Sequence, residues 1–528
     1  MMKLRAVTLI IGMIIATSAT GAVAESEENS AIETLIEYFN LLTTGNLESA
    51  AQMWSEAALE RSSRFGIEFS GIPLKVDAAS PVMGDLELMR EHLQPPARSI
   101  TEMEDGCVKL DYSALVKGRP VEHTYYAVFD GGYYWLSYPQ DHYSRDWATR
   151  ETEYFRIHFH PDREPYLNPV TLEAADLFVE FLADRLKLSG SDLKTIRTKK
   201  IEYFYCDSDR TVELITGVKT RGMLDLAAND IISSFFPHNH EVVHLLMNIS
   251  LGSLPLTTHP LLREGLAVCY GGRWGKAPSA LIGLGAFLCR ENIVTIDSLL
   301  TESQFNAHAG SDIAYPVAGL FTSFLLDRLD HRKYLRLYRE LSGTLPQVQT
   351  LADSTVRQMI LTATEAPSWT ELISGFEDFV ERQVTREMSL LPGDLENSRL
   401  LVEADGYSIF DNGEWLICEF TSSGGQPPSG NLLVGFDTRL QTARSAMFDE
   451  QYGGRLSNEG YRYGIRFDTN ESGLYDYASN QLVAKYILGI MPSQEYLNDD
   501  KSKITFRLKK SLLGDVQLSA DNCKMIPL

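Results

Sequence analysis

Cysteine is scarce in this chain of 528 residues, which has only six, and no two of them form a C-x-x-C pair. A small disulfide scaffold is therefore excluded, and no cysteine spacing indicates a metal site. Two pairs, Cys269 with Cys289 and Cys418 with Cys523, each fall inside one predicted domain and are permitted as disulfides. Buried free thiols explain the same cysteines equally well.

Positive charge is also in short supply. Lys and Arg number 48 against 71 Asp and Glu, which gives a formal net charge of -23. So acidic a surface repels phosphate, and we therefore expect no nucleic-acid partner and no anionic membrane surface as partner. The hydrophobic share of 44% and charged share of 23% are ordinary globular values, which exclude wholesale disorder and collagen.

Long apolar runs are missing beyond the N-terminus, so we expect no transmembrane segment in the mature chain. The N-terminus itself has the pattern of a secretory signal peptide. Lys3 and Arg5 precede the apolar stretch 6–20, and Ala22-Val23-Ala24 forms an A-x-A cleavage site. We predict cleavage after Ala24 and a periplasmic or secreted protein.

The length predicts several domains, and the overall fold class is multidomain α+β. After the signal peptide (1–24), residues 25–148 combine helices with alternating strands and a turn at Asp130-Gly131-Gly132. Residues 150–385 begin with strands at 154–159 and 201–206 around a helix at 171–188, and become helical after Pro237. Residues 390–528 contain short strands separated by regular turns, which is typical of a β-sandwich accessory domain.

The chemistry is concentrated in His240-Glu241-Val242-Val243-His244, an H-E-x-x-H motif. On a helix, residues i and i+4 share a face, so both imidazoles can bind one Zn²⁺. Glu241 projects beside them, where it can take a proton from a zinc-activated water. We expect Pro237 in the first turn of this helix. Taken alone, the motif also fits two ordinary histidines on a helix surface.

A second element argues against that simpler interpretation. Glu264 follows His244 by 20 residues, in the segment Leu261 to Ala267 that Pro260 starts as a helix. A carboxylate on a second helix completes a His₂Glu ligand set, which is a catalytic set because one position stays open for water.

"HEVVH" followed by "LLREGLA" resembles the gluzincin metallopeptidases, specifically the peptidase MA-like group, and the resemblance extends over residues 150–340. It implies a zincin-like core with a mixed sheet and active-site helices. It also implies zinc ligands at His240, His244 and Glu264, and Glu241 as general base.

The family implies a Tyr or His that stabilises the oxyanion. Tyr315, which opens "YPVAGLF", matches that position, with Tyr270 and His308 as alternatives; a packing role for Tyr315 explains it equally well. Thermolysin-like members carry an Asp four residues after the third ligand, where this chain has Val268.

The aminopeptidase signature G-x-M-E-N is absent from the chain, which favours an endopeptidase. Zincins pair an extended substrate with an edge strand, and 224–229 is the segment we predict for it.

The outer domains carry resemblances of their own. The opening "AIETLIEYFNLLTTGNLESAAQMW" is similar to nuclear transport factor 2-like domains, and "NLLVGFDT" with "YRYGIRFDTNESGLYDY" resembles the DOMON and carbohydrate-binding module family 9 group. The second resemblance implies a glycan or protein partner for the C-terminal domain. The full prediction is an exported zinc metallopeptidase acting on peptides or proteins. The alternative is a non-catalytic cell-envelope binding or assembly protein built on the same scaffold.

Overall fold

The computed structural model describes most of the chain. The described residues are 22–69, 74–78, 80, 97–103, 106–116, 119–254, 257–309, 313–343, 351–383, 388–389, 398–404, 406–421, 432–436, 460–467, 471–478, 481–487, 503–513, 519 and 522–527. Most of the predicted signal peptide lies outside these residues. Within them, no helix is long and apolar enough to cross a membrane.

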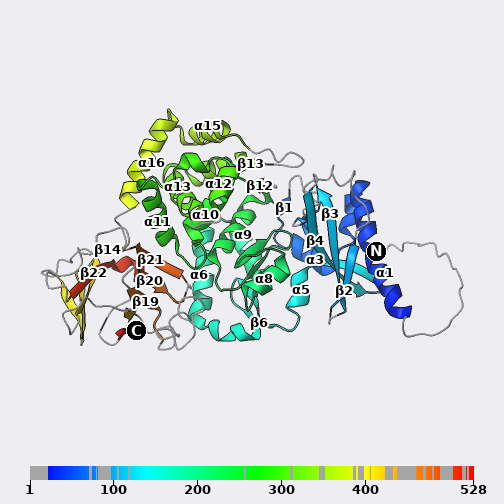
Figure 1. Cartoon of the computed structure of the whole chain (residues 1–528), viewed down its shortest axis with the longest axis horizontal. Coiled ribbons are helices and arrows are strands. Elements are labelled where there is room, and N and C mark those ends of the chain that lie inside the picture. Colours follow the sequence, from blue (N-terminus) through cyan, green and yellow to red (C-terminus); the bar gives the residue numbers. More distant parts are fainter. Residues whose placement is uncertain are drawn as a thin grey trace. The chain divides into compact units, whose positions relative to one another are not determined.

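The chain divides into two compact units of mixed α and β structure (Figure 1). The first comprises Met1–Leu59 and Leu86–His142, and the second comprises Glu60–Asp85 and Tyr143–Leu528. The predicted domain 25–148 is thus interrupted by a segment, Glu60–Asp85, that belongs to the second unit. A boundary read along the sequence has no means of showing such an excursion.

The first unit packs helices against an antiparallel sheet of order β2-β3-β4-β5. Its elements are α1 (Ala22–Thr43), α2 (Leu47–Ala51), the first half of α3 (Glu56–Ser63), β2 (Ala97–Glu102), β3 (Cys107–Val116), β4 (Arg119–Asp130), β5 (Tyr133–Ser137) and α5 (Pro139–Tyr143). The predicted turn at Asp130-Gly131-Gly132 joins β4 to β5. Aromatic side chains form the core, with the ring of Phe39 stacked on Tyr112 and that of Tyr38 edge-on to Trp54.

The second unit is organised around a five-stranded sheet of order β6-β7-β8-β10-β9. Its strands are β6 (Ala148–Glu151), β7 (Phe155–Phe159), β8 (Ile201–Tyr205), β9 (Gly222–Asp225) and β10 (Asp230–Ser233). β7, β8 and β10 run parallel, while β6 and β9 are antiparallel to their neighbours at the two edges. The predictions of strands at 154–159 and 201–206 are confirmed to within a residue.

The prediction of an edge strand at 224–229 is wrong in its bounds. The edge strand is β9, Gly222–Asp225, and residues 226–229 form the turn into β10. The Asp225 side chain accepts a hydrogen bond from the Ala227 backbone N–H at 2.9 Å, and Asn229 has a positive φ of 59°. A side chain bonded back to its own turn and a left-handed residue both end a strand.

Helices make up most of the rest of this part of the unit, and the prediction of a mainly helical region after Pro237 is confirmed. They are α6 (Pro169–Leu186), α7 (Gly190–Lys199), α8 (Asp209–Thr216), α9 (Asn239–Leu251), α10 (Pro260–Gly271), α11 (Pro278–Arg290), α12 (Glu302–Ala309), α13 (Ala314–Arg328), α14 (His331–Glu340), α15 (Asp353–Thr364) and α16 (Trp369–Gln383). Pro237 itself precedes the N-cap His238, so the expectation that it lies in the first turn of α9 is wrong by two residues.

Three short 3₁₀ helices and two short strand pairs complete the helical part. They are η1 (Lys75–Asp77), η2 (Pro161–Tyr166), η3 (Ile296–Leu299), the parallel pair β1 (Glu68–Phe69) with β11 (Ser253–Leu254), and the antiparallel pair β12 (Thr257–Thr258) with β13 (Ser342–Gly343). Side chains from the sheet and from α6, α9, α10 and α13 share one hydrophobic core. A helix such as α9, buried on nearly all faces, lies inside this core rather than on its surface.

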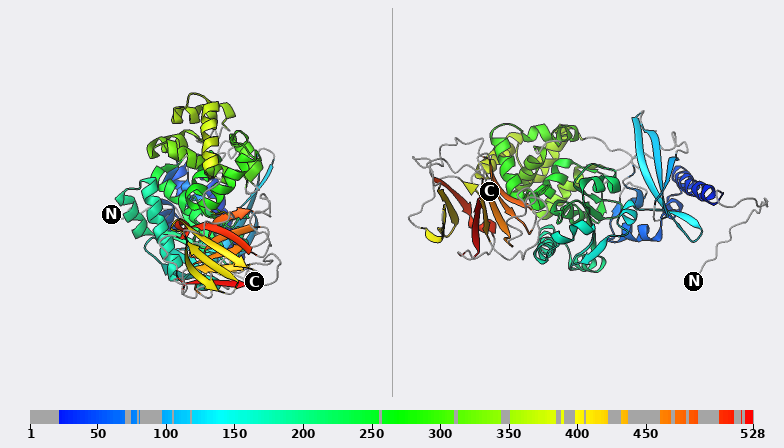
Figure 2. Two further views of the ribbon diagram at one scale, coloured as in Figure 1. Left: turned by 90° about the vertical axis from the view of Figure 1, so that its left-hand side faces the viewer. Right: turned by 60° about the horizontal axis from the view of Figure 1, so that its bottom comes forward.

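The C-terminal part is formed from two five-stranded antiparallel sheets, shown in yellow to red in Figure 2. One sheet has the order β14-β22-β17-β16-β15 and the other β21-β20-β19-β18-β23. The strands are β14 (Met388–Ser389), β15 (Arg399–Ala404), β16 (Tyr407–Asp411), β17 (Trp415–Thr421), β18 (Leu432–Phe436), β19 (Tyr463–Phe467), β20 (Glu471–Asp476), β21 (Gln481–Ile487), β22 (Lys503–Lys509) and β23 (Cys523–Pro527). The expectation of a strand-rich region is confirmed.

The C-terminal sheets contact the helical part directly. Tyr461, Tyr475 and Tyr477 form a buried cluster with Ala280 of α11, and Val170 and Ala174 of α6 pack against it. All six cysteines are free thiols, so neither of the two permitted disulfides is present.

Candidate metal centre

Helix α9 carries the two histidines of the H-E-x-x-H motif. It follows β10 directly, and its cap residue Gly252 has a positive φ of 69° that ends it after Leu251. His240 and His244 lie one turn apart on the same face, with ring centroids 4.8 Å apart. The helix therefore presents both imidazoles to one point, as the i, i+4 spacing predicts.

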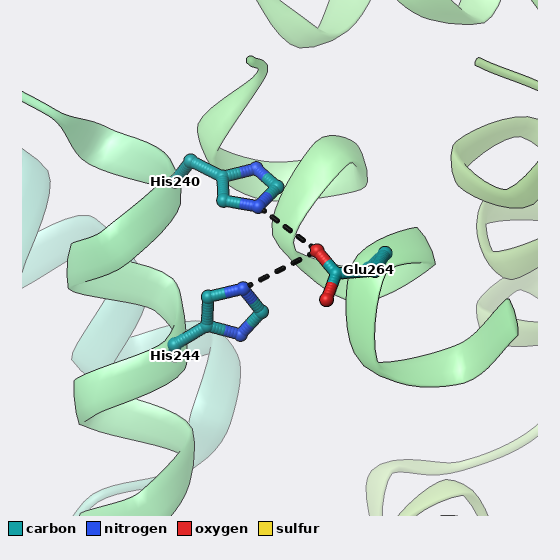
Figure 3. A group of neighbouring side chains, drawn as sticks. All are labelled: His240, His244 and Glu264. Carbon is teal, nitrogen blue, oxygen red and sulfur yellow. Dashed lines mark hydrogen bonds and ion pairs between the residues drawn. The ribbon is translucent and has the colours of Figure 1, made fainter. Parts of the chain in front are cut away.

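Helix α10 brings the carboxylate to that point. His259 caps its N-terminus by accepting a hydrogen bond from the Leu261 N–H at 3.2 Å, and Pro260 occupies the first turn. Glu264 is one turn further along. Its Oε2 lies 3.2 Å from His240 Nε2 and 3.5 Å from His244 Nε2 (Figure 3).

The geometry of these three side chains fits a zinc ion. Tetrahedral coordination at about 2.0–2.1 Å places ligand atoms about 3.3 Å from one another. The two measured separations bracket that value, and all three ligand atoms lie within 4.8 Å of one another. Among the residues that the structure describes, this is the one group of three or more His, Cys, Asp or Glu side chains arranged to hold a metal.

A backbone carbonyl orients His240. The ring donates its Nδ1–H to the Gly272 carbonyl at 2.7 Å, which directs Nε2 towards Glu264. The approach is close because Gly271 has no side chain: a Cβ there would meet the Asn239 carbonyl carbon and the His240 nitrogen at 2.7 Å. The His240 ring is thus held by a backbone carbonyl.

Arg263 holds the other oxygen of Glu264. Its Nε lies 2.8 Å from Glu264 Oε1, which leaves Oε2 to face the histidines. Burial by itself raises the pKa of Glu264, but Arg263, His244 and His240 outweigh burial and hold that pKa well below its usual value. Burial likewise lowers the pKa of His240, and the bond to Glu264 with the nearby carboxylate charges raises it overall.

Glu241 points to the edge strand. Its Oε2 accepts a hydrogen bond from the Leu224 backbone N–H at 2.8 Å, and its Oε1 lies 3.8 Å from His238 Nε2. Leu224 faces the open side of β9, since Met223 and Asp225 supply the bonds to β10 at the opposite side. The edge strand thus holds the carboxylate beside the two metal-facing imidazoles.

His238 is fully buried next to this carboxylate. Its Nδ1 lies 3.1 Å from Ser233 Oγ, and the Ser233 hydroxyl donates its single hydrogen to the Arg221 carbonyl. His238 therefore donates Nδ1–H to Ser233. Burial, followed by the proximity of His240, His244 and Arg273, holds the pKa of His238 well below its ordinary value, so this ring is neutral.

Tyr315 lies at the same site, on the first turn of α13. Its ring centroid is 6.5 Å from that of His240, and the Arg273 guanidinium lies 3.2 Å above the ring. Burial and the charge of Glu264 raise the pKa of Tyr315. Tyr270 instead packs edge-on against Phe181 of α6, and His308 lies on α12.

Several of these contacts have no sequence motif. Arg263 is adjacent to Glu264 in the sequence, and this adjacency is the only sequence signal for their ion pair. Gly272, Leu224 and Arg273 act through backbone groups or through a fold-dependent approach, which no spacing rule reveals. His158, an ordinary strand histidine, pairs with Glu202 at 2.7 Å and lies away from the group.

No protein-family model, curated protein or solved structure matches this chain.

Proposed function

We propose that this protein is an exported zinc-dependent endopeptidase of the gluzincin type, with His240, His244 and Glu264 as zinc ligands and Glu241 as general base. The observation that carries the proposal is the convergence of both imidazole Nε2 atoms on one oxygen of Glu264, at 3.2 and 3.5 Å. The set contains three protein ligands and a neighbouring carboxylate, which is the composition of a catalytic zinc site rather than a structural one.

Each side chain has a definite task in peptide hydrolysis. Bound zinc supplies Lewis-acid polarisation of the attacking water and of the scissile carbonyl. Glu241 takes the proton of that water and delivers it to the leaving amine. Tyr315 donates a hydrogen bond to the oxygen on which negative charge develops, and Arg273, stacked on its ring, adds positive charge nearby. Arg263 keeps Glu264 ionised and correctly turned.

Substrate binding follows from the edge strand. The open side of β9 lies next to Glu241, which accepts the Leu224 N–H. An extended peptide that pairs with this strand would lie across the ligand cluster. We expect a peptide bound in this way to extend on both sides of the cleaved bond, which agrees with the endopeptidase interpretation of the sequence.

The accessory parts are assigned by the resemblances already described. The first unit is proposed as a nuclear transport factor 2-like domain. The C-terminal part is proposed as a β-sandwich that tethers the enzyme to a glycan or protein partner, and its two five-stranded antiparallel sheets support this assignment. Signal cleavage after Ala24 would deliver the protein to the periplasm or the exterior.

A non-catalytic binding or assembly protein is the second candidate. It would need the same scaffold but no use for Glu241. The hydrogen bond that places Glu241 beside the histidines favours the enzyme, because a scaffold without chemistry has no requirement for a carboxylate at that position.

The deciding experiment measures zinc per chain by elemental mass spectrometry in the purified mature protein and in the His244→Ala variant, followed by cleavage of unfolded casein. We expect close to one zinc, its loss in the variant, and cleavage that Glu241→Gln abolishes. A chain that takes up no zinc when zinc is supplied would disprove the metal site. Zinc uptake without any cleavage would support the binding protein instead.

A further inference from the structure

A segment far from the H-E-x-x-H motif in the sequence donates hydrogen bonds to the turn that follows edge strand β9. We call residues 60–69 and 74–78 the clamp segment; it contains the end of α3, β1 and η1 and belongs to the same unit as the metal centre. The Arg64 guanidinium donates to the Asn229 carbonyl at 2.7 Å. Lys75 Nζ donates to the Ala227 carbonyl at 2.8 Å and to the Ser62 carbonyl at 2.7 Å.

The turn that receives these hydrogen bonds is formed by residues 226–229, directly after β9. Ala227, Ala228 and Asn229 are all at least 98% buried, so their carbonyl groups have little access to water. The Asn229 side chain in turn donates to the Ser62 carbonyl at 3.2 Å. Arg64 and Lys75 therefore supply hydrogen-bond donors to carbonyl groups that water cannot easily reach.

The contacts go beyond charge neutralisation. Arg64 also binds the buried Asp230 at 3.1 Å, as a simple ion pair would require. Its bond to the Asn229 carbonyl and the two carbonyl bonds of Lys75 fix backbone, not charge. Burial lowers the pKa of Lys75 to about 8, so its ammonium remains largely protonated and able to donate at neutral pH.

The turn is connected to the proposed general base through two residues of strand. Leu224 donates to Glu241, and Asp225 begins the turn by accepting the Ala227 N–H. A shift of the turn therefore moves the open side of β9 relative to α9. The same segment pairs with the chain just beyond α9, since Glu68 is in parallel register with Ser253. The clamp segment thus touches both elements between which a peptide would lie.

We propose that Arg64 and Lys75 are positioning residues. They hold edge strand β9 in the position relative to α9 that binding of an extended peptide backbone over the metal centre requires. The inference rests on the proposed function and adds its determinant of substrate class: extended chains of several residues, not small molecules that reach the metal alone. Arg64 and Lys75 act through the backbone of the turn and touch neither the ligands nor Glu241.

Two probes separate the strand from the metal. Acetohydroxamate binds zinc without any peptide, whereas a hydroxamate carrying a Leu-Ala dipeptide adds a backbone that can pair with β9. Their dissociation constants are measured by calorimetry on the full chain loaded with zinc, in the wild type, Arg64→Met, Arg64→Lys and Lys75→Met. Arg156→Met is the control. Arg156 also pairs with Glu202, at 2.8 Å against 3.8 Å for Arg64, but it belongs to β7.

The expected result is a change in one probe only. Arg64→Met and Lys75→Met should weaken the peptidyl hydroxamate about tenfold, as loss of about one backbone hydrogen bond implies. Acetohydroxamate affinity and zinc content should stay within about twofold of wild type. Arg64→Lys, which keeps the charge, should recover part of the lost affinity for the peptidyl hydroxamate. The Arg156→Met control should bind the peptidyl hydroxamate as tightly as the wild type does.

Other outcomes overturn the inference. If the ratio of the affinities for the peptidyl hydroxamate and acetohydroxamate is the same in the wild type and both Met variants, the clamp segment does not position the strand. Equal weakening of both probes would assign Arg64 and Lys75 to general folding. A zinc-loaded wild type that binds neither probe would overturn the proposed function itself. A wild type that binds both probes with equal affinity would overturn only the role of β9.

Discussion

The imidazole of His240 donates its Nδ1–H to the backbone carbonyl of Gly272 at 2.7 Å. This contact joins the helix that carries the motif to the end of the helix that carries Glu264. It fixes both the tautomer and the direction of the ring, so the Nε2 atom meets the carboxylate. The relationship depends on the absence of a side chain at Gly271, where α10 touches the start of α9.

Gly271→Ala should therefore damage the metal site. The added Cβ would lie 2.6 Å from the Asn239 carbonyl oxygen, so the two helices must separate by several tenths of an ångström. We expect zinc affinity to fall at least about tenfold, the order found when a partner that orients a ligand is disturbed. Competition with a fluorescent chelator measures this. Gly283→Ala on α11 is the control, because a Cβ there meets nothing within 4 Å; equal affinities would contradict the prediction.

Glu241→Gln should separate zinc binding from catalysis. Gln keeps the shape and can still contact the Leu224 N–H through its carbonyl oxygen, but it cannot accept the proton of water. Zinc per chain should be unchanged, while the cleavage rate should fall at least about 100-fold, the usual share of a general base. A variant that cleaves at the wild-type rate would remove Glu241 from the mechanism.

Zinc should stabilise the folded chain through His244. A ligand that binds only the native state adds about 2.7 kcal/mol to the free energy of unfolding at 100 times its dissociation constant. Urea unfolding with and without chelator should show that difference in the wild type and none in His244→Ala. His158→Ala provides the control, because His158 pairs with Glu202 outside the ligand group and should keep the zinc response.

Acid should weaken the protein at the start of α10. His259 caps that helix through Nδ1 and donates Nε2–H to the Leu300 carbonyl at 3.1 Å, so its native form is neutral. Burial, with a contribution from Arg263, lowers its pKa from 6.5 to about 4. Between these values the unfolded chain binds a proton that the native chain does not. Stability is therefore lost as pH falls from 6.5 towards 4, by up to about 3 kcal/mol.

The variant His259→Asn tests this directly, because Asn also caps a helix but does not titrate. Its free energy of unfolding should depend less steeply on pH than that of the wild type between pH 6.5 and 4. His160→Asn is the control, since His160 caps η2 from a partly exposed position. Parallel pH curves for the wild type and His259→Asn would refute the assignment.

The edge strand shows where interpretation of the sequence reaches its limit. The run from Leu224 to Asn229 is apolar enough for a strand. The strand nevertheless ends at Asp225, because the Asp225 side chain bonds to the turn and Asn229 is left-handed. The residues that hold this turn, Arg64 and Lys75, lie more than 150 positions earlier, within a region that the sequence pattern assigns to another domain.

The sequence by itself determined the features that depend on short-range periodicity. The spacing of His240 and His244 places them on one helix face, Pro260 starts the helix of Glu264, and alternating patterns locate most strands to within a residue or two. Only the tertiary structure decided which backbone groups meet them. The Gly272 carbonyl, the Leu224 N–H and the clamp at the β9 turn are uniform peptide groups or distant cations, and their partners are chosen by how the elements pack rather than by any residue type.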